Sequence, residues 1–242
     1  MNLEEAIYSR QSCRAYTKED LSQEDREKVE SFIQNDLHPL YPNIRVEFKL
    51  ENRSAIKTVM PWMSNQVITI YSEVKNGYGL NVGFMGQHLE LYLHTIGLSC
   101  CWVGLAKPVK KDHPLEYIIC MAIGYARKKG IRDFTQFKRK DWSFFSDQVD
   151  KELECARLAP SSVNSQPWFF THENDWIHMW YIPQKGPFHS LKLNPTLFNQ
   201  IDLGIALAHI CICHEGCTLS KNSNLHYQNY LYILSIKLSQ NV

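Results

Sequence analysis

The sequence lacks the features of several large protein classes. No apolar run approaches the roughly 18 consecutive residues of a membrane-spanning helix, so no membrane partner is expected. Residues 1–6 are acidic and have no apolar signal core, which favours a cytoplasmic protein. The formal net charge is only +1. Nucleic-acid surfaces carry a clear basic excess, so no nucleic-acid partner is expected either.

The composition that remains is typical of a globular protein. The 242 residues are 44% hydrophobic and 21% charged. A chain of this length can bury a sizeable core, as one large domain or as two small halves. Eight cysteines without a signal peptide are expected to be reduced thiols.

Three of these cysteines lie near a histidine, in the order Cys211, Cys213, His214 and Cys217. Cys213 and Cys217 could ligate a metal from one face of a helix, which leaves a metal-binding regulator open as an alternative function. The spacing fits neither a Cys-x-x-Cys knuckle nor the haem-attachment motif. The apolar residues around them indicate a buried helix, where free cysteine packs as a small hydrophobe. We therefore expect no metal site.

A polar turn between a helix and an aromatic strand is the most distinctive stretch of the chain. Val149, Leu153 and Ala156 recur at helical spacing, and Pro160 ends the helix. Five polar side chains follow within six positions: Ser161, Ser162, Asn164, Ser165 and Gln166. Residues 168–170 then predict a buried strand. Such a turn can surround a flat ligand with donors and acceptors, although Pro, Ser and Asn are also common in ordinary loops.

A second candidate site lies near the N-terminus, in Tyr8-Ser-Arg-Gln-Ser-Cys-Arg-Ala-Tyr16. Arg10, Ser12 and Arg14 alternate, so in an extended segment they project to one side. Arginine offers a rigid fork of donors to anionic oxygens, which makes this face a candidate phosphate clamp. A solvated surface strand is the alternative interpretation.

The two segments resemble the motifs of the nitroreductase-like flavoproteins. Ala159-Pro-Ser-Ser-Val-Asn-Ser-Gln-Pro-Trp168 is similar to the A-P-S-x-x-N-x-Q-P-W signature, and residues 10–16 resemble R-x-S-x-R-x-[YF]. Residues 98–105 resemble the family segment in which a backbone N–H faces the flavin N5, here near Val103 or Gly104. The resemblance implies an α+β fold of mostly antiparallel sheets flanked by helices. It also implies FMN as the cofactor and NAD(P)H as the electron donor.

By this resemblance the reaction is a ping-pong hydride transfer through flavin N5 to a nitro, quinone or similar small acceptor. The flavin carries the chemistry, so no catalytic residue is expected. A non-enzymatic flavin-binding or redox-sensing protein remains open, as does a dehalogenase-like or flavin-cleaving relative. The expected cofactor-binding residues are Arg10, Gln11, Ser12, Arg14, Trp102, Val103, Gly104, Leu105, Pro160, Ser161, Ser162, Asn164 and Gln166.

The order of predicted elements repeats along the chain, which indicates two degenerate halves. Helices over 24–34 and 80–96 and a strand over 118–125 parallel helices over 147–158 and 200–215 and a strand over 230–236. Each half lacks the motif that the other keeps, and Lys128, Gly130, Arg132 and Phe134 have the spacing of the N-terminal clamp. We predict halves at residues 1–126 and 127–242 that pack as one pseudo-dimer with one FMN, leaving further dimerisation open.

Overall fold

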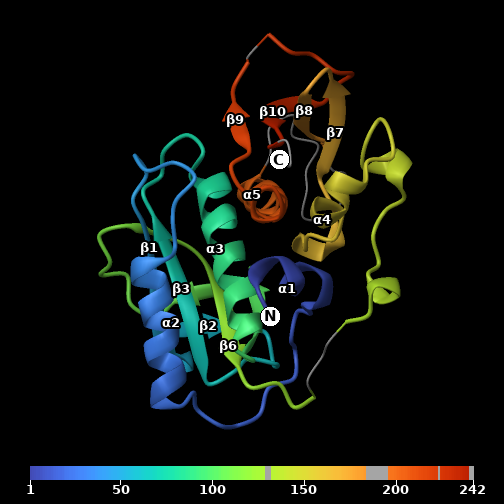
Figure 1. Ribbon diagram of the computed structural model, residues 1–242. Coiled ribbons are helices and arrows are strands. Elements are labelled where there is room, and N and C mark those ends of the chain that lie inside the picture. The colour runs from blue at the N-terminus through green and yellow to red at the C-terminus, as the bar shows by residue number, and fades with distance from the viewer. Residues whose placement is uncertain (129–131, 184–195, 223, 240–242) are drawn as a thin grey trace.

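The computed structural model describes residues 1–128, 132–183, 196–222 and 224–239. Two long helices, α3 (Tyr78–Thr95) and α5 (Leu197–Cys213), lie between two four-stranded antiparallel sheets (Figure 1). The predicted α+β class with antiparallel sheets and flanking helices is confirmed. Among the described residues, no helix is long and apolar enough to cross a membrane.

The first sheet has the order β1-β3-β6-β4 and the second the order β7-β8-β10-β9. Their strands are β1 (Val46–Asn52), β3 (Gln66–Ser72), β6 (Glu116–Gly124), β4 (Ser99–Val103), β7 (Trp168–Glu173), β8 (Trp176–Tyr181), β10 (Leu231–Lys237) and β9 (Thr218–Ser220). In both sheets, the first two strands along the chain lie side by side, and the fourth strand lies between the second and the third. Two predicted halves would produce this correspondence, although the boundary between residues 126 and 127 stays a prediction. A small ribbon pairs β2 (Ile56–Thr58) with β5 (Ala106–Pro108).

The two central helices touch backbone to backbone. A Cβ on Gly83 of α3 would lie 2.0 Å from the carbonyl oxygen of Ile201, and one on Gly204 of α5 would lie 2.1 Å from that of Leu80. Any side chain at either position would force the helices apart. This crossing brings the face of α5 that carries Ile201 close to the first half of the chain.

The shorter helices cover the edges of this core. They are α1 (Leu3–Ser9), α2 (Gln23–Asn35) and α4 (Glu154–Arg157), with 3-10 turns η1 (Arg53–Ala55), η2 (Phe134–Gln136), η3 (Trp142–Phe144), η4 (Lys151–Leu153) and η5 (Ser162–Asn164). Glycines in the left-handed region follow both long helices, with Gly97 at φ 82° and Gly216 at φ 79°. Gly130, one of the positions predicted to repeat the N-terminal clamp, lies outside the described residues.

The helix predicted over 147–158 is wrong for most of its length, since only η4 and the four-residue α4 form there. Asp147 instead accepts hydrogen bonds from the backbone N–H and the ring of His172, at 3.0 and 2.6 Å. The Asp150 side chain accepts from the N–H of Glu152 and contacts the other ring nitrogen of His172. These contacts tie the segment to β7, and a helix could not keep them.

Candidate functional site

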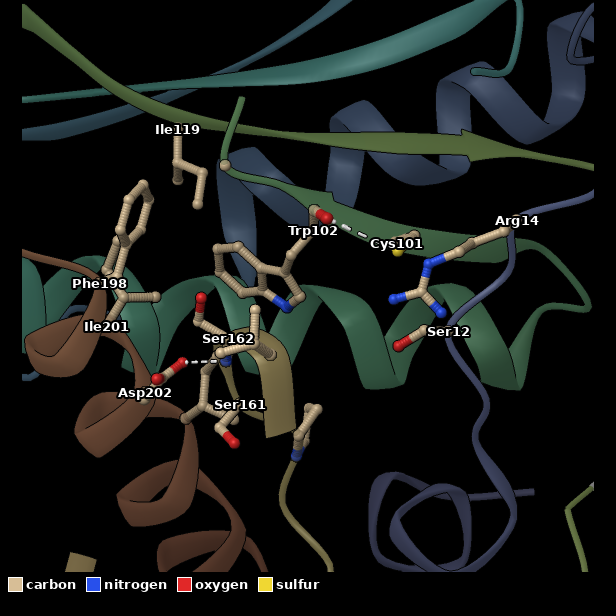
Figure 2. A pocket seen from close by; sticks show the side chains of 14 residues that line it. Ser12, Arg14, Cys101, Trp102, Ile119, Ser161, Ser162, Phe198, Ile201 and Asp202 are labelled. Atoms are coloured by element: carbon tan, nitrogen blue, oxygen red, sulfur yellow. Dashed lines mark hydrogen bonds between the residues drawn. The ribbon is translucent and has the colours of Figure 1, made fainter. Parts of the chain in front are cut away.

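A cavity of about 150 Å³ lies where five segments meet (Figure 2). Ser12 and Arg14 of the N-terminal segment lie on one side of Trp102, and Phe198 and Asp202 of α5 lie on the other. The cavity is lined by Ser12, Arg14, Cys101, Trp102, Gly104, Ile119, Pro160, Ser161, Ser162, Val163, Phe198, Ile201, Asp202 and Ile205. Residues of both predicted halves therefore share one cavity.

The N-terminal segment runs beside β4. The N–H of Cys13 donates to the carbonyl oxygen of Cys100 at 2.9 Å, and the Tyr16 hydroxyl donates to the carbonyl oxygen of Ala122 at 3.0 Å. This extended course directs Ser12 and Arg14 to the cavity. Arg10 is only 2% exposed and lies behind Ser12, to whose hydroxyl its Nη2 donates at 2.8 Å.

A buried carboxylate of α3 connects the arginine with the tryptophan. Glu90, 3% exposed, is ion-paired with Arg10 (Nε to Oε1, 3.0 Å) and accepts from Trp102 Nε1 at 2.9 Å. The indole packs on Gly86, where a Cβ would lie 2.3 Å from Cη2 of the ring. Glu90 thus fixes one wall of the cavity and the cation behind it.

The surroundings of Arg10 carry an excess of positive charge. Its Nη1 is buried and has no hydrogen-bond partner among the described residues. Burial, followed by the charges of Arg10 and Arg14, lowers the pKa of Arg132. Burial, Arg10 and Arg132 lower the pKa of Arg139 to about 9. The buried N–H group of Arg10 needs an acceptor, and the nearby arginines repel one another. An anionic group such as a phosphate would satisfy the donor and reduce this repulsion.

The polar turn has an unusual backbone. Val163, Asn164 and Gln166 have φ values of 48°, 56° and 46°. This left-handed region is unfavourable for a residue with a Cβ, above all for a β-branched valine. The Ser161 hydroxyl accepts from the N–H of Gln166 at 2.9 Å, which holds the two ends of the turn together. Ser161, Ser162 and Val163 of this turn line the cavity.

Asp202 of α5 holds the same turn from the cavity wall. Its carboxylate is 2% exposed and accepts from the Ser162 N–H at 2.8 Å and from the Ser165 hydroxyl at 3.4 Å. Burial raises the pKa of Asp202 to about 7, against the opposing effect of these two hydrogen bonds. The group therefore changes charge near neutral pH.

The predicted residues fall into three groups. Seven line the cavity: Ser12, Arg14, Trp102, Gly104, Pro160, Ser161 and Ser162. Val103 and Leu105 line a neighbouring apolar hollow, Gln11 lines a basic hollow on the other side, and Arg10 lies behind Ser12. Asn164 and Gln166 bond instead to residues 138–140, the segment that leads from the first sheet to α4.

Sequence reasoning missed the contribution of α5 and three residues of other segments. The missed lining residues are Cys101, Ile119, Val163, Phe198, Ile201, Asp202 and Ile205. One signal was available, since Glu90 is the only acidic residue of α3 and Asp202 the only one of α5. A single carboxylate in an otherwise apolar helix needs a polar partner, and both acids have theirs at this cavity.

The cysteine and histidine side chains near the end of α5 have separate partners. The Cys211 and Cys217 thiols lie 3.4 Å apart. Cys213 hydrogen-bonds to Cys155, and the His214 ring bonds to the Glu152 carbonyl oxygen at 2.8 Å. Within the described part of the chain, no three His, Cys, Asp or Glu side chains are placed to share a metal ion.

Comparisons with known proteins agree with this architecture. The family model described as "Putative TM nitroreductase" matches residues 2–214. A structure described as a "putative nitroreductase" from Thermotoga maritima is 19% identical, with a TM-score of 0.68 over 98% of this chain and 94% of that chain. This likeness shows the fold. No curated protein matches the sequence.

Two shorter structures match part of the chain. A nitroreductase family protein from Clostridium difficile 630 is 19% identical, with a TM-score of 0.46 over 62% of this chain and 100% of its own. A "putative nitroreductase in complex with FMN" from Desulfovibrio desulfuricans is 17% identical, with a TM-score of 0.44 over 62% of this chain and 98% of its own.

Proposed function

The chain belongs to the nitroreductase family, and from this premise we propose that it is an FMN-dependent oxidoreductase. NAD(P)H is the proposed electron donor, and a nitro compound, a quinone or a similar small molecule is the proposed acceptor. Family membership supports the oxidoreductase class. The cofactor, the donor and the acceptor are inferences from the cavity and from the motifs that line it.

The observation that carries the proposal is the composite cavity, with a buried guanidinium behind one end that keeps one N–H group unpaired. Ser12 and Arg14 come from one predicted half, and Ser161 and Ser162 from the other. Behind them Arg10 keeps a buried N–H group without a partner among the described residues. FMN has a phosphate for the cationic end and a flat ring with a polar rim for the walls, so the residues present fit this cofactor.

The cavity alone is too small for a flavin, since about 150 Å³ holds a single benzene-sized ring. Two neighbouring hollows extend it. Ser12 and Arg14 also line a basic hollow of about 290 Å³ that includes Arg127 and Lys128. Trp102 and Phe198 also line an apolar hollow of about 180 Å³. Together the three reach the size range of cofactor sites, with a basic end and an apolar end.

FMN, when bound, supplies the hydride chemistry of the reaction. The protein residues bind and orient it. Arg10, Ser12 and Arg14 offer cationic and hydroxyl donors, while Trp102 and Phe198 offer apolar walls. The wall that holds Trp102 also contains the backbone N–H groups near Val103 and Gly104, which the family resemblance assigns to the flavin. The apolar hollow would receive the donor and the acceptor in turn.

One FMN per chain is the proposed stoichiometry. The corresponding hollow on the other side of the central helices lies near Tyr41, in the segment after α2. The Tyr41 ring packs on Gly77, where a Cβ would lie 2.8 Å from Cε2, and Lys221 lies 5.6 Å from its centre. Lys221 is the only cation among the described residues that line this hollow. A bulky ring and a single lysine do not reproduce the Arg10 and Arg14 clamp.

The test is the visible spectrum of the purified protein, with FMN quantified after denaturation. We expect about one FMN per chain, bleaching by NADH or NADPH without oxygen, and recovery of the yellow form when a quinone is added. A protein that binds no added FMN would refute the proposal. Bound FMN that neither nucleotide reduces would favour the non-enzymatic flavin binder.

A further inference from the structure

The polar turn takes its shape from residues 138–140, which belong to neither motif. Asn164 Nδ2 donates to the Lys138 carbonyl oxygen at 2.9 Å, and the N–H of Lys140 donates to Gln166 Oε1 at 2.9 Å. Lys140 Nζ also donates to the carbonyl oxygens of Ser165 and Gln166, at 2.7 and 3.2 Å. This segment therefore binds most of the polar groups that the turn directs away from the cavity.

Arg139 makes two contacts that bridge residues 158 and 164. Its Nη1 donates to Asn164 Oδ1 at 3.1 Å, near the end of the turn, and its Nη2 donates to the Leu158 carbonyl oxygen at 2.7 Å, before the turn begins. The guanidinium also lies over the Phe137 ring, 5.4 Å from its centre. A planar fork can hold both oxygens and stack on the ring at once, whereas a lysine ammonium cannot.

The turn needs such support because its backbone is strained. Val163, Asn164 and Gln166 all have left-handed φ values, a conformation that persists only where the surroundings enforce it. Asn164 and Gln166 are the two predicted cofactor-binding residues whose side chains bond to residues 138–140 instead of lining the cavity. Their contacts fix the backbone that presents Ser161 and Ser162 to the cavity.

We propose that Arg139 is a positioning residue of the FMN site. It acts by clamping residues 158–164, and the backbone of Lys138 and Lys140 assists it. This inference rests on the proposed function. It assigns Asn164 an indirect role, because Asn164 would support the cofactor through Arg139. It also makes residues 138–140, near the start of the second predicted half, part of the cofactor site.

The test compares the affinities of the apo protein for FMN and riboflavin, by flavin fluorescence titration of wild type and Arg139→Gln. Because the variant loses charge-assisted hydrogen bonds that hold the turn, both ligands should bind about tenfold more weakly. The ratio of the two affinities should stay at the wild-type value. Arg45→Gln is the matched control, since Arg45 is 64% exposed and lies at the start of β1; its affinities should match wild type.

Each other result has a defined meaning. If Arg139→Gln binds FMN and riboflavin as tightly as Arg45→Gln does, the inference is overturned and the proposed function stays intact. A loss for FMN but not for riboflavin would mean that Arg139 contacts the phosphate, which also overturns the positioning role. A wild-type protein that binds neither ligand would remove the proposed function and this inference together.

A double-mutant cycle tests the indirect role of Asn164. If Asn164 acts through Arg139, adding Asn164→Ala to Arg139→Gln should weaken riboflavin binding by less than twofold further. Additive losses would overturn that role. Thermal unfolding of each apo variant shows whether it folds. If Arg139→Gln does not fold, Arg139→Lys takes its place, and wild-type riboflavin affinity in that variant would overturn the proposal.

Discussion

Asp202→Asn should remove an effect of pH on stability that arises at the cavity. Burial raises the pKa of Asp202 from its ordinary value of 3.8 to about 7. Between these values the folded state holds a proton that the unfolded chain has released. The free energy of unfolding therefore falls as pH rises through this window, by about 1.4 kcal/mol per pH unit and about 4 kcal/mol in all. Above pH 7 the loss is complete.

Asparagine keeps the shape of the aspartate but cannot ionise. Its carbonyl oxygen can still accept from the Ser162 N–H, now 2.8 Å from Asp202, and its amide can donate to the Ser165 hydroxyl. We therefore expect the stability of Asp202→Asn, measured relative to wild type, to rise by about 4 kcal/mol between pH 4 and pH 8. Urea unfolding of the apo proteins at half-unit pH steps measures this difference directly.

Comparison with wild type at each pH removes the contribution of other groups. Asp175→Asn is the control, since Asp175 is 68% exposed and its replacement should leave the slope unchanged. Parallel curves for wild type and Asp202→Asn would refute the reasoning. They would mean that Asp202 is ionised throughout and that its hydrogen bonds offset the cost of burial.

Three further changes follow from the same contacts. Gly86→Ala should weaken FMN binding in a flavin titration, because its Cβ would lie 2.3 Å from the Trp102 ring and push it into the cavity; unchanged affinity would contradict this. Glu90→Gln should lower the free energy of unfolding by about 3–5 kcal/mol in urea, since buried Arg10 loses its carboxylate; wild-type stability would contradict it. Burial lowers the pKa of His209 to about 3. The contribution of His209 to the free energy of unfolding should therefore fall as the pH drops below 6.5, opposite to the contribution of Asp202. His209→Gln should remove this fall, and a ring that titrates near pH 6 by NMR would refute it.

Sequence pattern predicts the elements where local and tertiary preferences agree. The long central helices and the apolar strands were predicted within a few residues, because burial on all sides leaves an unbroken apolar pattern. The helix over 147–158 was wrong because Asp147 and Asp150 bind His172, which lies more than 20 positions later. No local pattern contains that contact.

The sequence predicted which segments form the candidate site, but not which of their side chains line it. The spacing of the two motifs resembles that of the nitroreductase-like flavoproteins, and this resemblance predicted that residues 10–14 and 160–166 belong to one site. The cavity unites Arg14 with Ser161. The same spacing could not show that Asn164 turns away, because its orientation depends on Arg139 and on a left-handed backbone at Val163. The contact between Arg139 and Asn164 joins residues far apart in the sequence, so no periodic pattern of residues reveals it.

The two buried carboxylates give the cavity an uneven charge. Glu90 is ion-paired with Arg10, which keeps one N–H group unpaired, and Arg14 adds a further positive charge at the same end of the cavity. Asp202 has only neutral donors and gains its charge near pH 7, so the α5 wall becomes anionic above neutrality. On the proposed function, an anionic cofactor would be attracted to the arginine end and repelled by the opposite wall. The charges of these two walls would then act with the apolar walls of Trp102 and Phe198 to orient the cofactor.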